Sequence, residues 1–278
     1  MTCLNCGAIN TDRFCASCGQ RMVPAYPTMR EMLGDAWHEF VGYDGRFVRT
    51  LALLQRQPGS LTNEVLQGRR ARYIFPIRLY LFASFLYFVV AAVAPSPLDR
   101  SSGLTLKDDD IVVRLDRGAG GLSEEERAAL LANIDQQPPV LRPLLRAIAT
   151  DPQGFQRSFY EHMPRALFAL VPFFALVMRA FYRGGWVQHM TFSLHLHAAI
   201  FLMLFVRELS RFTENIVVVG IFEVLTLIAM IAYTLIAMRT VYADRWGRVL
   251  LKVVPIALVY TIGYAIAVLV AIALTVGW

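Results

Sequence analysis

The sequence predicts a mainly α-helical protein that crosses a membrane about five times and carries a short metal-binding segment at its N-terminus. Of its 278 residues, 56% are hydrophobic and only 17% are charged, with a mean hydropathy of +0.47. A soluble domain has roughly 25% charged residues. The apolar residues also gather in five stretches of about 17 to 25 residues, the length that a helix needs to cross a bilayer. These observations exclude a purely water-soluble enzyme.

The balance of charge favours a membrane surface over nucleic acid. The chain has 27 basic and 21 acidic residues, a formal net charge of +6, and nearly all of the bases are arginine. A mild excess of this kind suits anionic lipid headgroups better than it suits a dedicated nucleic-acid binder. The lipid bilayer is therefore the first partner that the composition indicates.

All four cysteines lie near the start of the chain, as two Cys-x2-Cys pairs: Cys3 with Cys6, and Cys15 with Cys18. Two such knuckles aim four thiolates at one ion, which predicts one structural zinc in a ribbon over residues 1–22. A module of about twenty residues buries too little apolar surface to fold alone, so the metal supplies most of its folding energy. The alternative is a pair of disulfides in an exported domain, which the lack of a signal-like apolar run disfavours.

Residues 23–76 are expected to form cytoplasmic amphipathic and juxtamembrane helices. Apolar residues recur at helical spacing over Met29–Val41, which predicts an amphipathic helix. Shorter helices are expected at 47–54 and 62–66. Three arginines then form a basic collar: Arg69, Arg70 and Arg72. Arginines just before an apolar span anchor it at the interface, and they are also candidates for binding a lipid headgroup.

The membrane part is expected to hold five spans. The first is expected at 77–94, followed by an extracytoplasmic helical loop domain at 95–163. The other four lie within the region 164–278, at 166–182, 190–206, 216–238 and 253–276. Basic residues near the span ends show only a weak positive-inside bias. Because thiolates must stay reduced to bind zinc, the N-terminus is expected to be cytoplasmic.

Titratable side chains inside an apolar span are costly, so each is a functional candidate. The third and fourth spans contain five polar candidates: His189, Ser193, His195, His197 and Glu223. His195 and His197 lie roughly 200° apart around a helix, so they cannot hold one metal from the same face. His189, Ser193 and His197 do share a face. This stripe is either a hydrogen-bonded seam between helices or a polar path for protons or metal.

Glu223 is expected near the outer border of the membrane. It lies seven residues inside the fourth span, roughly 10 Å deep. At that depth it is too far from His197 to pair with it, so Arg207 or Arg211 is the expected partner, or the carboxyl is protonated. The sequence has no phosphate-binding loop, HExxH motif or nucleophile elbow. No catalytic residue is therefore assigned, and an enzyme is the least favoured class.

Four segments of the chain resemble an uncharacterised bacterial family of small integral membrane proteins, domain of unknown function 3667. They are CLNCGAINTDRFCASCGQR, YDGRFVRTLALLQRQPG, GRRARYIFP and GGWVQHMTFSLHLHAAIF. Members of that family begin with a zinc ribbon that ends in Cys-Gly-Gln. The resemblance implies a place in the bacterial inner membrane and zinc ligands at four positions: Cys3, Cys6, Cys15 and Cys18. It supplies no reaction.

Together these patterns favour a non-enzymatic scaffold or regulatory protein, whose zinc ribbon mediates a partner or self interaction. The ribbon contains only two bases, Arg13 and Arg21, so nucleic-acid binding is disfavoured. The alternative is a small transporter or channel-like protein. Its polar path would be lined by His189, Ser193, His197 and Glu223.

Overall fold

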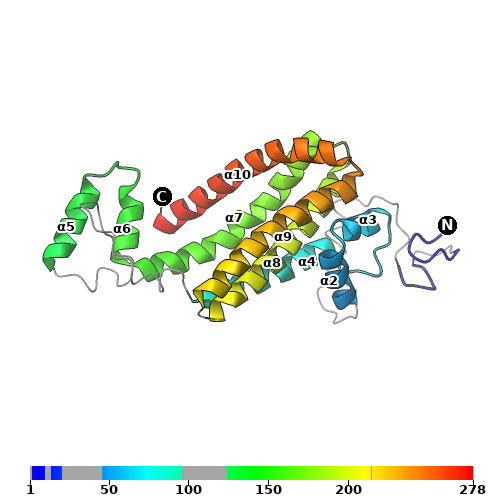
Figure 1. Ribbon diagram of the computed structural model, residues 1–278, viewed down its shortest axis with the longest axis horizontal. Helices are drawn as coiled ribbons and strands as arrows, with labels where there is room; N and C mark the ends of the chain where they lie inside the picture. The colour runs from blue at the N-terminus through cyan, green and yellow to red at the C-terminus, as the bar shows by residue number, and fades with distance from the viewer. Residues whose placement is uncertain (1, 10–13, 21–45, 96–123, 214, 278) are drawn as a thin grey trace. The chain divides into compact units, whose positions relative to one another are not determined.

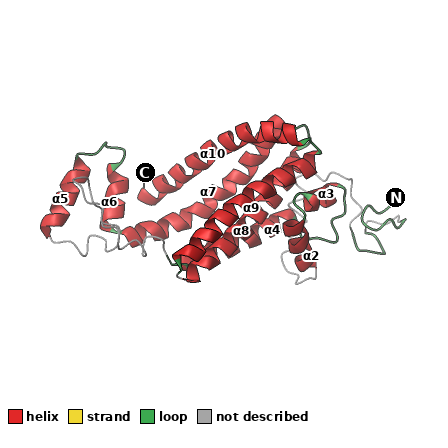
Figure 2. Ribbon diagram, in the orientation of Figure 1, coloured by secondary structure: helices red, strands yellow, loops and turns green. Residues whose placement is uncertain are grey.

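Figure 1 shows the computed structural model of the chain, which describes residues 2–9, 14–20, 46–95, 124–213 and 215–277. The described residues form helices and loops (Figure 2), apart from isolated bridge positions in the N-terminal segments, among them the antiparallel bridge between Thr2 and Ile9. The amphipathic helix expected at Met29–Val41 lies outside the described residues. The same is true of the two ribbon bases, Arg13 and Arg21.

Five helices are long and apolar enough to cross a membrane, judged by length and composition. They are α4 (Pro76–Val93), α7 (Pro152–Phe181), α8 (Trp186–Ser210), α9 (Ile216–Tyr242) and α10 (Trp246–Val276). The predicted fold class is therefore confirmed: the protein is mainly α-helical, with five membrane-length helices and a cluster of four cysteines at the N-terminus. Several of these helices run past the expected spans, because a helix continues beyond its apolar window into polar sequence.

Successive spans run in opposite directions across a bilayer. The start of α4, the turn at 182–185 and the turn at 243–245 therefore belong to one membrane side, which we call the collar side because the basic collar directly precedes α4. The turn between α8 and α9 belongs to the opposite side, the far side.

The chain divides into two compact units. The first comprises Met1–Ala91 and Leu170–Gly263, and it holds all of the site candidates. The second comprises Ala92–Ala169 and Tyr264–Trp278. Within the second unit, α5 (Glu124–Asp135) and α6 (Arg142–Thr150) form a small helical pair, which an ion pair between Arg146 and Asp135 joins.

The core of the first unit surrounds α8. Every residue from 191 to 199 is buried, and 61% of the apolar window of this helix is buried, against 11% for both α9 and α10. α8 is therefore the central helix, and the other two present apolar side chains outward, as lipid-facing helices do.

Two short helices, α2 (Arg46–Arg56) and α3 (Ser60–Leu66), pack against α8 and α9. Gly59 begins α3 with a φ of +83°, a conformation that glycine adopts without a Cβ penalty. A Cβ at this position would lie 2.8 Å from the carbonyl oxygen of Ala237. The glycine therefore lets the turn between α2 and α3 come close to α9, at the collar-side end of that helix.

Candidate functional site

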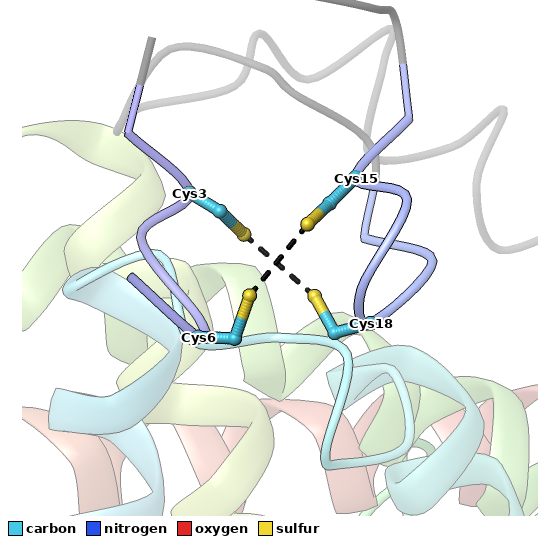
Figure 3. Close-up of side chains that lie close together, drawn as sticks. All are labelled: Cys3, Cys6, Cys15 and Cys18. Carbon is cyan, nitrogen blue, oxygen red and sulfur yellow. Dashed lines mark hydrogen bonds between the residues drawn. The ribbon is translucent and has the colours of Figure 1, made fainter. Parts of the chain in front are cut away.

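The four cysteine thiols point toward one another (Figure 3) and form the candidate metal centre of the cysteine head, residues 2–9 and 14–20. Their Sγ atoms all lie within 4.8 Å of one another. The Sγ atoms of Cys3 and Cys18 are 3.7 Å apart, and those of Cys6 and Cys15 are 3.6 Å apart. Four sulfurs around one zinc ion, at about 2.3 Å each, lie about 3.8 Å from one another. The four thiols therefore fit a single ion of this size.

Each cysteine pair is presented by the same backbone turn. The N–H of Gly7 donates to the carbonyl of Cys3, and the N–H of Gly19 donates to the carbonyl of Cys15, both at 2.8 Å. Gly7 and Gly19 have φ angles of +78° and +70°, which residues with a Cβ rarely adopt. The glycine after each pair therefore closes the knuckle that holds two thiols on one side.

Hydrogen bonds to sulfur favour the thiolate form in the second knuckle. The side chain of Asn5, followed by the backbone of Gln20, lowers the pKa of Cys18 to about 6. The backbone groups of Ser17 and Cys18 lower the pKa of Cys15. The thiolate is the form that ligates a metal, so the Asn5 side chain and nearby backbone groups favour that form at these two cysteines.

The cysteine head contacts the collar loop, residues 67–73, which joins α3 to α4. The side chain of Gln20 makes three of the bonds. Its Nε2 donates to the carbonyl of Gly68 at 2.7 Å, and its Oε1 accepts from the backbone N–H groups of Arg70 and Ala71, both at 3.1 Å. Sequence reasoning did not single out Gln20, because its partners lie about fifty residues further along the chain. The available signal was its place in the Cys-Gly-Gln ending of the ribbon, two residues after Cys18.

The first knuckle contacts the same loop. The guanidinium of Arg72 donates to the carbonyl of Asn5 at 3.2 Å. Gly68 has a φ of +83°, and a Cβ there would lie 2.6 Å from Cδ1 of Leu4. The loop therefore needs glycine at this position, both for its backbone conformation and for the close approach of Leu4.

The collar arginines all have partners within the protein. Arg69 forms an ion pair with Glu64 through two nitrogens, and this hydrogen bond lowers the pKa of the Glu64 carboxyl. Nε of Arg70 donates to the carbonyl of Val65 at 3.3 Å, while Arg72 binds the head. A role of these arginines at a lipid headgroup stays a prediction.

The polar stripe of α8 bonds this helix to its neighbours. Nδ1 of His197 lies 2.8 Å from the carbonyl oxygen of Ser193, and Nε2 lies 2.8 Å from the hydroxyl of Tyr260 in α10. Since Nδ1 faces a carbonyl, it carries the proton, and Nε2 accepts from the tyrosine. The hydroxyl of Ser193 donates to the carbonyl of Val171 in α7 at 2.7 Å. This part of the stripe links three helices.

The other two histidines of α8 bind different elements. Nδ1 of His189 lies 2.9 Å from the hydroxyl of Tyr242, near the end of α9. Nδ1 of His195 lies 2.9 Å from the hydroxyl of Thr62 in α3. Nε2 of His195 is buried and has no hydrogen-bond partner among the described residues; a cavity of about 10 Å³ lies beside this side chain. As their spacing predicts, His195 and His197 face different neighbours.

Glu223 belongs to a charged cluster at the far side. Its carboxylate lies 3.4 Å from Arg207 and 3.7 Å from Arg211, which confirms the expected pairing with an arginine at this border. Glu208 binds the same two arginines, Arg211 at 3.0 Å, and its side chain is only 2% exposed. Sequence reasoning missed Glu208, because the third span was expected to end at residue 206, whereas α8 continues to Ser210.

Fold and site define the class: a multi-pass α-helical protein, with five membrane-length helices and an N-terminal cluster of four cysteines that can hold a metal ion. Residues 44–88 match the model of a family described as protein of unknown function (DUF3667). The matched stretch includes α2, α3, the collar loop and most of α4. None of the curated proteins matches the chain, and no solved structure does.

Proposed function

We propose that this chain is a non-enzymatic scaffold or regulatory protein of the bacterial inner membrane, whose cytoplasmic cysteine head binds one structural zinc and mediates interaction. The observation that carries the proposal is the contact of the head with its own collar loop through Gln20. Because the head contacts a loop of its own chain, we assign self-interaction as its main role.

Zinc is favoured by the ligand set. Four thiolates on two Cys-x2-Cys knuckles are typical of structural zinc sites, in which no coordination position is left open for substrate. Iron also accepts four thiolates in a tetrahedral arrangement, so the metal is to be identified by measurement. A closed set of four protein ligands supports a structural role for the metal rather than a catalytic one.

A protein partner is favoured over nucleic acid. Three large apolar side chains of the head are exposed: Ile9 at 87%, Phe14 at 55% and Leu4 at 48%. Nucleic acids are bound mainly through Lys and Arg contacts to phosphate, whereas exposed apolar side chains suit a protein surface. The face of the head that carries Ile9 is the surface that we assign to a partner.

The transporter hypothesis takes second place, because hydrogen bonds to protein groups occupy the polar side-chain atoms of Ser193 and His197, although Nε2 of His189 has no partner among the described residues. A path for ions or protons needs polar groups that face a water-filled cavity. The hydroxyl of Ser193 and both ring nitrogens of His197 instead bind protein groups. These contacts favour a packed seam.

Metal analysis of the purified full-length protein tests the proposal. We expect about one zinc per chain, and loss of that zinc when Cys3 and Cys6 are both replaced by Ser. Ser17→Ala is the matched control, because its exposed side chain belongs to the head and lies outside the ligand set. One zinc retained after both cysteine substitutions, or a wild-type protein without zinc, would contradict the assignment.

A second experiment addresses the partner face. Ile9→Asp should abolish the binding of any protein that co-purifies through the head, and it should leave the zinc content unchanged. If the protein still co-purifies with this variant at its original yield, the partner binds elsewhere on the chain.

A further inference from the structure

We propose that the cysteine head is a metal-dependent clasp on the collar loop. In this proposal the loop is held only while the metal keeps the two knuckles together, so the start of the first membrane helix responds to the metal state of the head. The inference rests on the metal site of the proposed function. It adds that this site controls the collar loop.

The two knuckles meet at the metal centre. Cys3 lies beside Cys18, and Cys6 lies beside Cys15, so both close sulfur pairs join one knuckle to the other. The cysteine head is too small to form an apolar core that could fix the knuckles by itself. Their relative position is therefore a consequence of metal binding.

Each knuckle supplies a different contact to the collar loop. The first provides the carbonyl of Asn5, which accepts from Arg72, and the side chain of Leu4, which packs on Gly68. The second provides Gln20 with its three hydrogen bonds. When the two knuckles are linked, they bind the loop more tightly than two separate knuckles would, because the first contact raises the effective concentration at which the second forms. If the knuckles separate, this gain in binding is lost.

Gln20 binds the loop with both ends of its amide. Nε2 donates one bond and Oε1 accepts two, all with one short stretch of backbone, so the donor and the acceptor cannot exchange places without losing all three bonds. The residue lies two positions after Cys18, and the N–H of Cys15 donates to its carbonyl at 2.8 Å. The knuckle that binds the metal therefore also orients this side chain.

The opposite side of the loop is fixed to the two short helices α2 and α3. The N–H of Ile74 donates to the buried hydroxyl of Thr50 in α2 at 3.0 Å, and Arg69 pairs with Glu64 in α3. Pro76 then begins α4. The loop is thus held between the head on one side and α2 with α3 on the other, directly before the first span. Release of the head frees one of these two sides.

Hydrogen–deuterium exchange on the full-length protein in lipid nanodiscs tests the clasp. The amides of Arg70 and Ala71 are the reporters, because both donate to Gln20. In the zinc-loaded protein we expect them to be protected. Removal of zinc with a chelator should accelerate their exchange by at least about tenfold, and added Zn²⁺ should restore the protection.

Gln20→Ala separates the clasp from the metal site. We expect this variant to keep its zinc and to exchange at Arg70 and Ala71 as fast as the chelated wild type, with or without metal. Gln67→Ala is the matched control: this exposed glutamine lies in the same loop, and its replacement should leave the exchange unchanged.

The outcomes are distinct. If Gln20→Ala leaves the loop protected, or if chelation removes the zinc and protection persists, the clasp is wrong while the zinc site stands. If the wild-type protein binds no metal, the proposed function fails, and a metal-dependent clasp fails with it.

Discussion

The cysteine head and the seam of α8 both gather polar side chains, yet different forces hold them together. The head is small, and Cys6 is exposed on its surface. The seam lies in α8, the most buried of the five membrane-length helices, where Ser193 is fully buried and His197 is 7% exposed. In the proposed function an ion organises the first cluster, whereas the exclusion of water organises the second. Chelation should therefore reverse the first and leave the second intact.

The difference follows from what an unpaired polar group costs in each place. At the head, a released carbonyl or amide binds water at little cost. Inside an apolar bundle, an unpaired donor or acceptor costs about 1–3 kcal/mol. Removal of the metal should thus affect the head and the collar loop that it holds, while substitutions in the seam should affect the stability of the membrane helices.

Chelation should have the largest effect and should be confined to one region. The metal supplies roughly 10 kcal/mol or more to the folding of a small zinc module, so its removal should unfold the cysteine head, residues 2–9 and 14–20. The amides of α8 should keep their protection. Exchange measured over both regions of the same sample checks this. A matching loss of protection in α8 would show that the metal also supports the bundle.

The far-side cluster should show the next largest effect. Glu208→Leu leaves Arg207 and Arg211 without their buried partner, and the loss of one member of a buried ion pair costs about 3–5 kcal/mol. Glu223→Leu is the control. Glu223 binds the same arginines over longer distances, and its side chain is 42% exposed. Its replacement should therefore lower the free energy of unfolding by less than the replacement of Glu208 does.

Unfolding of both variants in an SDS titration gives the two free energies. Equal losses of unfolding free energy in the two variants would mean that burial does not determine how much each carboxylate contributes to stability.

The sequence predicted features that short-range patterns encode, and it missed features that depend on distant partners. Apolar windows identified five helices, because each must satisfy its backbone within the bilayer. Cysteine spacing identified the candidate ligands, because both knuckles are local turns. Gln20 and Glu208 were missed for different reasons. The partners of Gln20 come from a loop distant in sequence, and the role of Glu208 depends on where α8 ends, which hydropathy defines only to within a few residues.

The polar stripe shows the same limit. Its shared face followed from the helical repeat. Whether it borders a cavity or a neighbouring helix depends on Val171 and Tyr260, which belong to other spans. A single sequence does not indicate which spans are adjacent, so the bonds of this stripe to α7 and α10 could not be predicted from it.

A double-mutant cycle in the seam should show a moderate effect. Tyr260→Phe removes the hydroxyl that donates to Nε2 of His197 and leaves a buried acceptor unpaired, at a cost of about 1–3 kcal/mol. His197→Leu removes the same bond from the other side. In the double variant neither partner of this bond is left unpaired. The double variant should therefore lose less unfolding free energy than the two single variants lose in sum.

Strict additivity of these losses, measured by SDS unfolding, would show that the two groups do not interact. A variant pair that keeps full stability but loses a transport phenotype would instead revive the polar path.

The smallest expected effect concerns the bond between Thr62 and His195, which joins α3 to α8. Thr62→Val keeps the shape of the side chain and removes the hydroxyl, so Nδ1 of His195 joins Nε2 in having no partner. We expect a loss of about 1 kcal/mol and faster exchange in α3 but not in α9. Thr234→Val is the control, because its hydroxyl bonds only to Met230 within the same helix. If the two variants lose the same stability, the bond between Thr62 and His195 does not stabilise α3, and the seam does not extend to that helix.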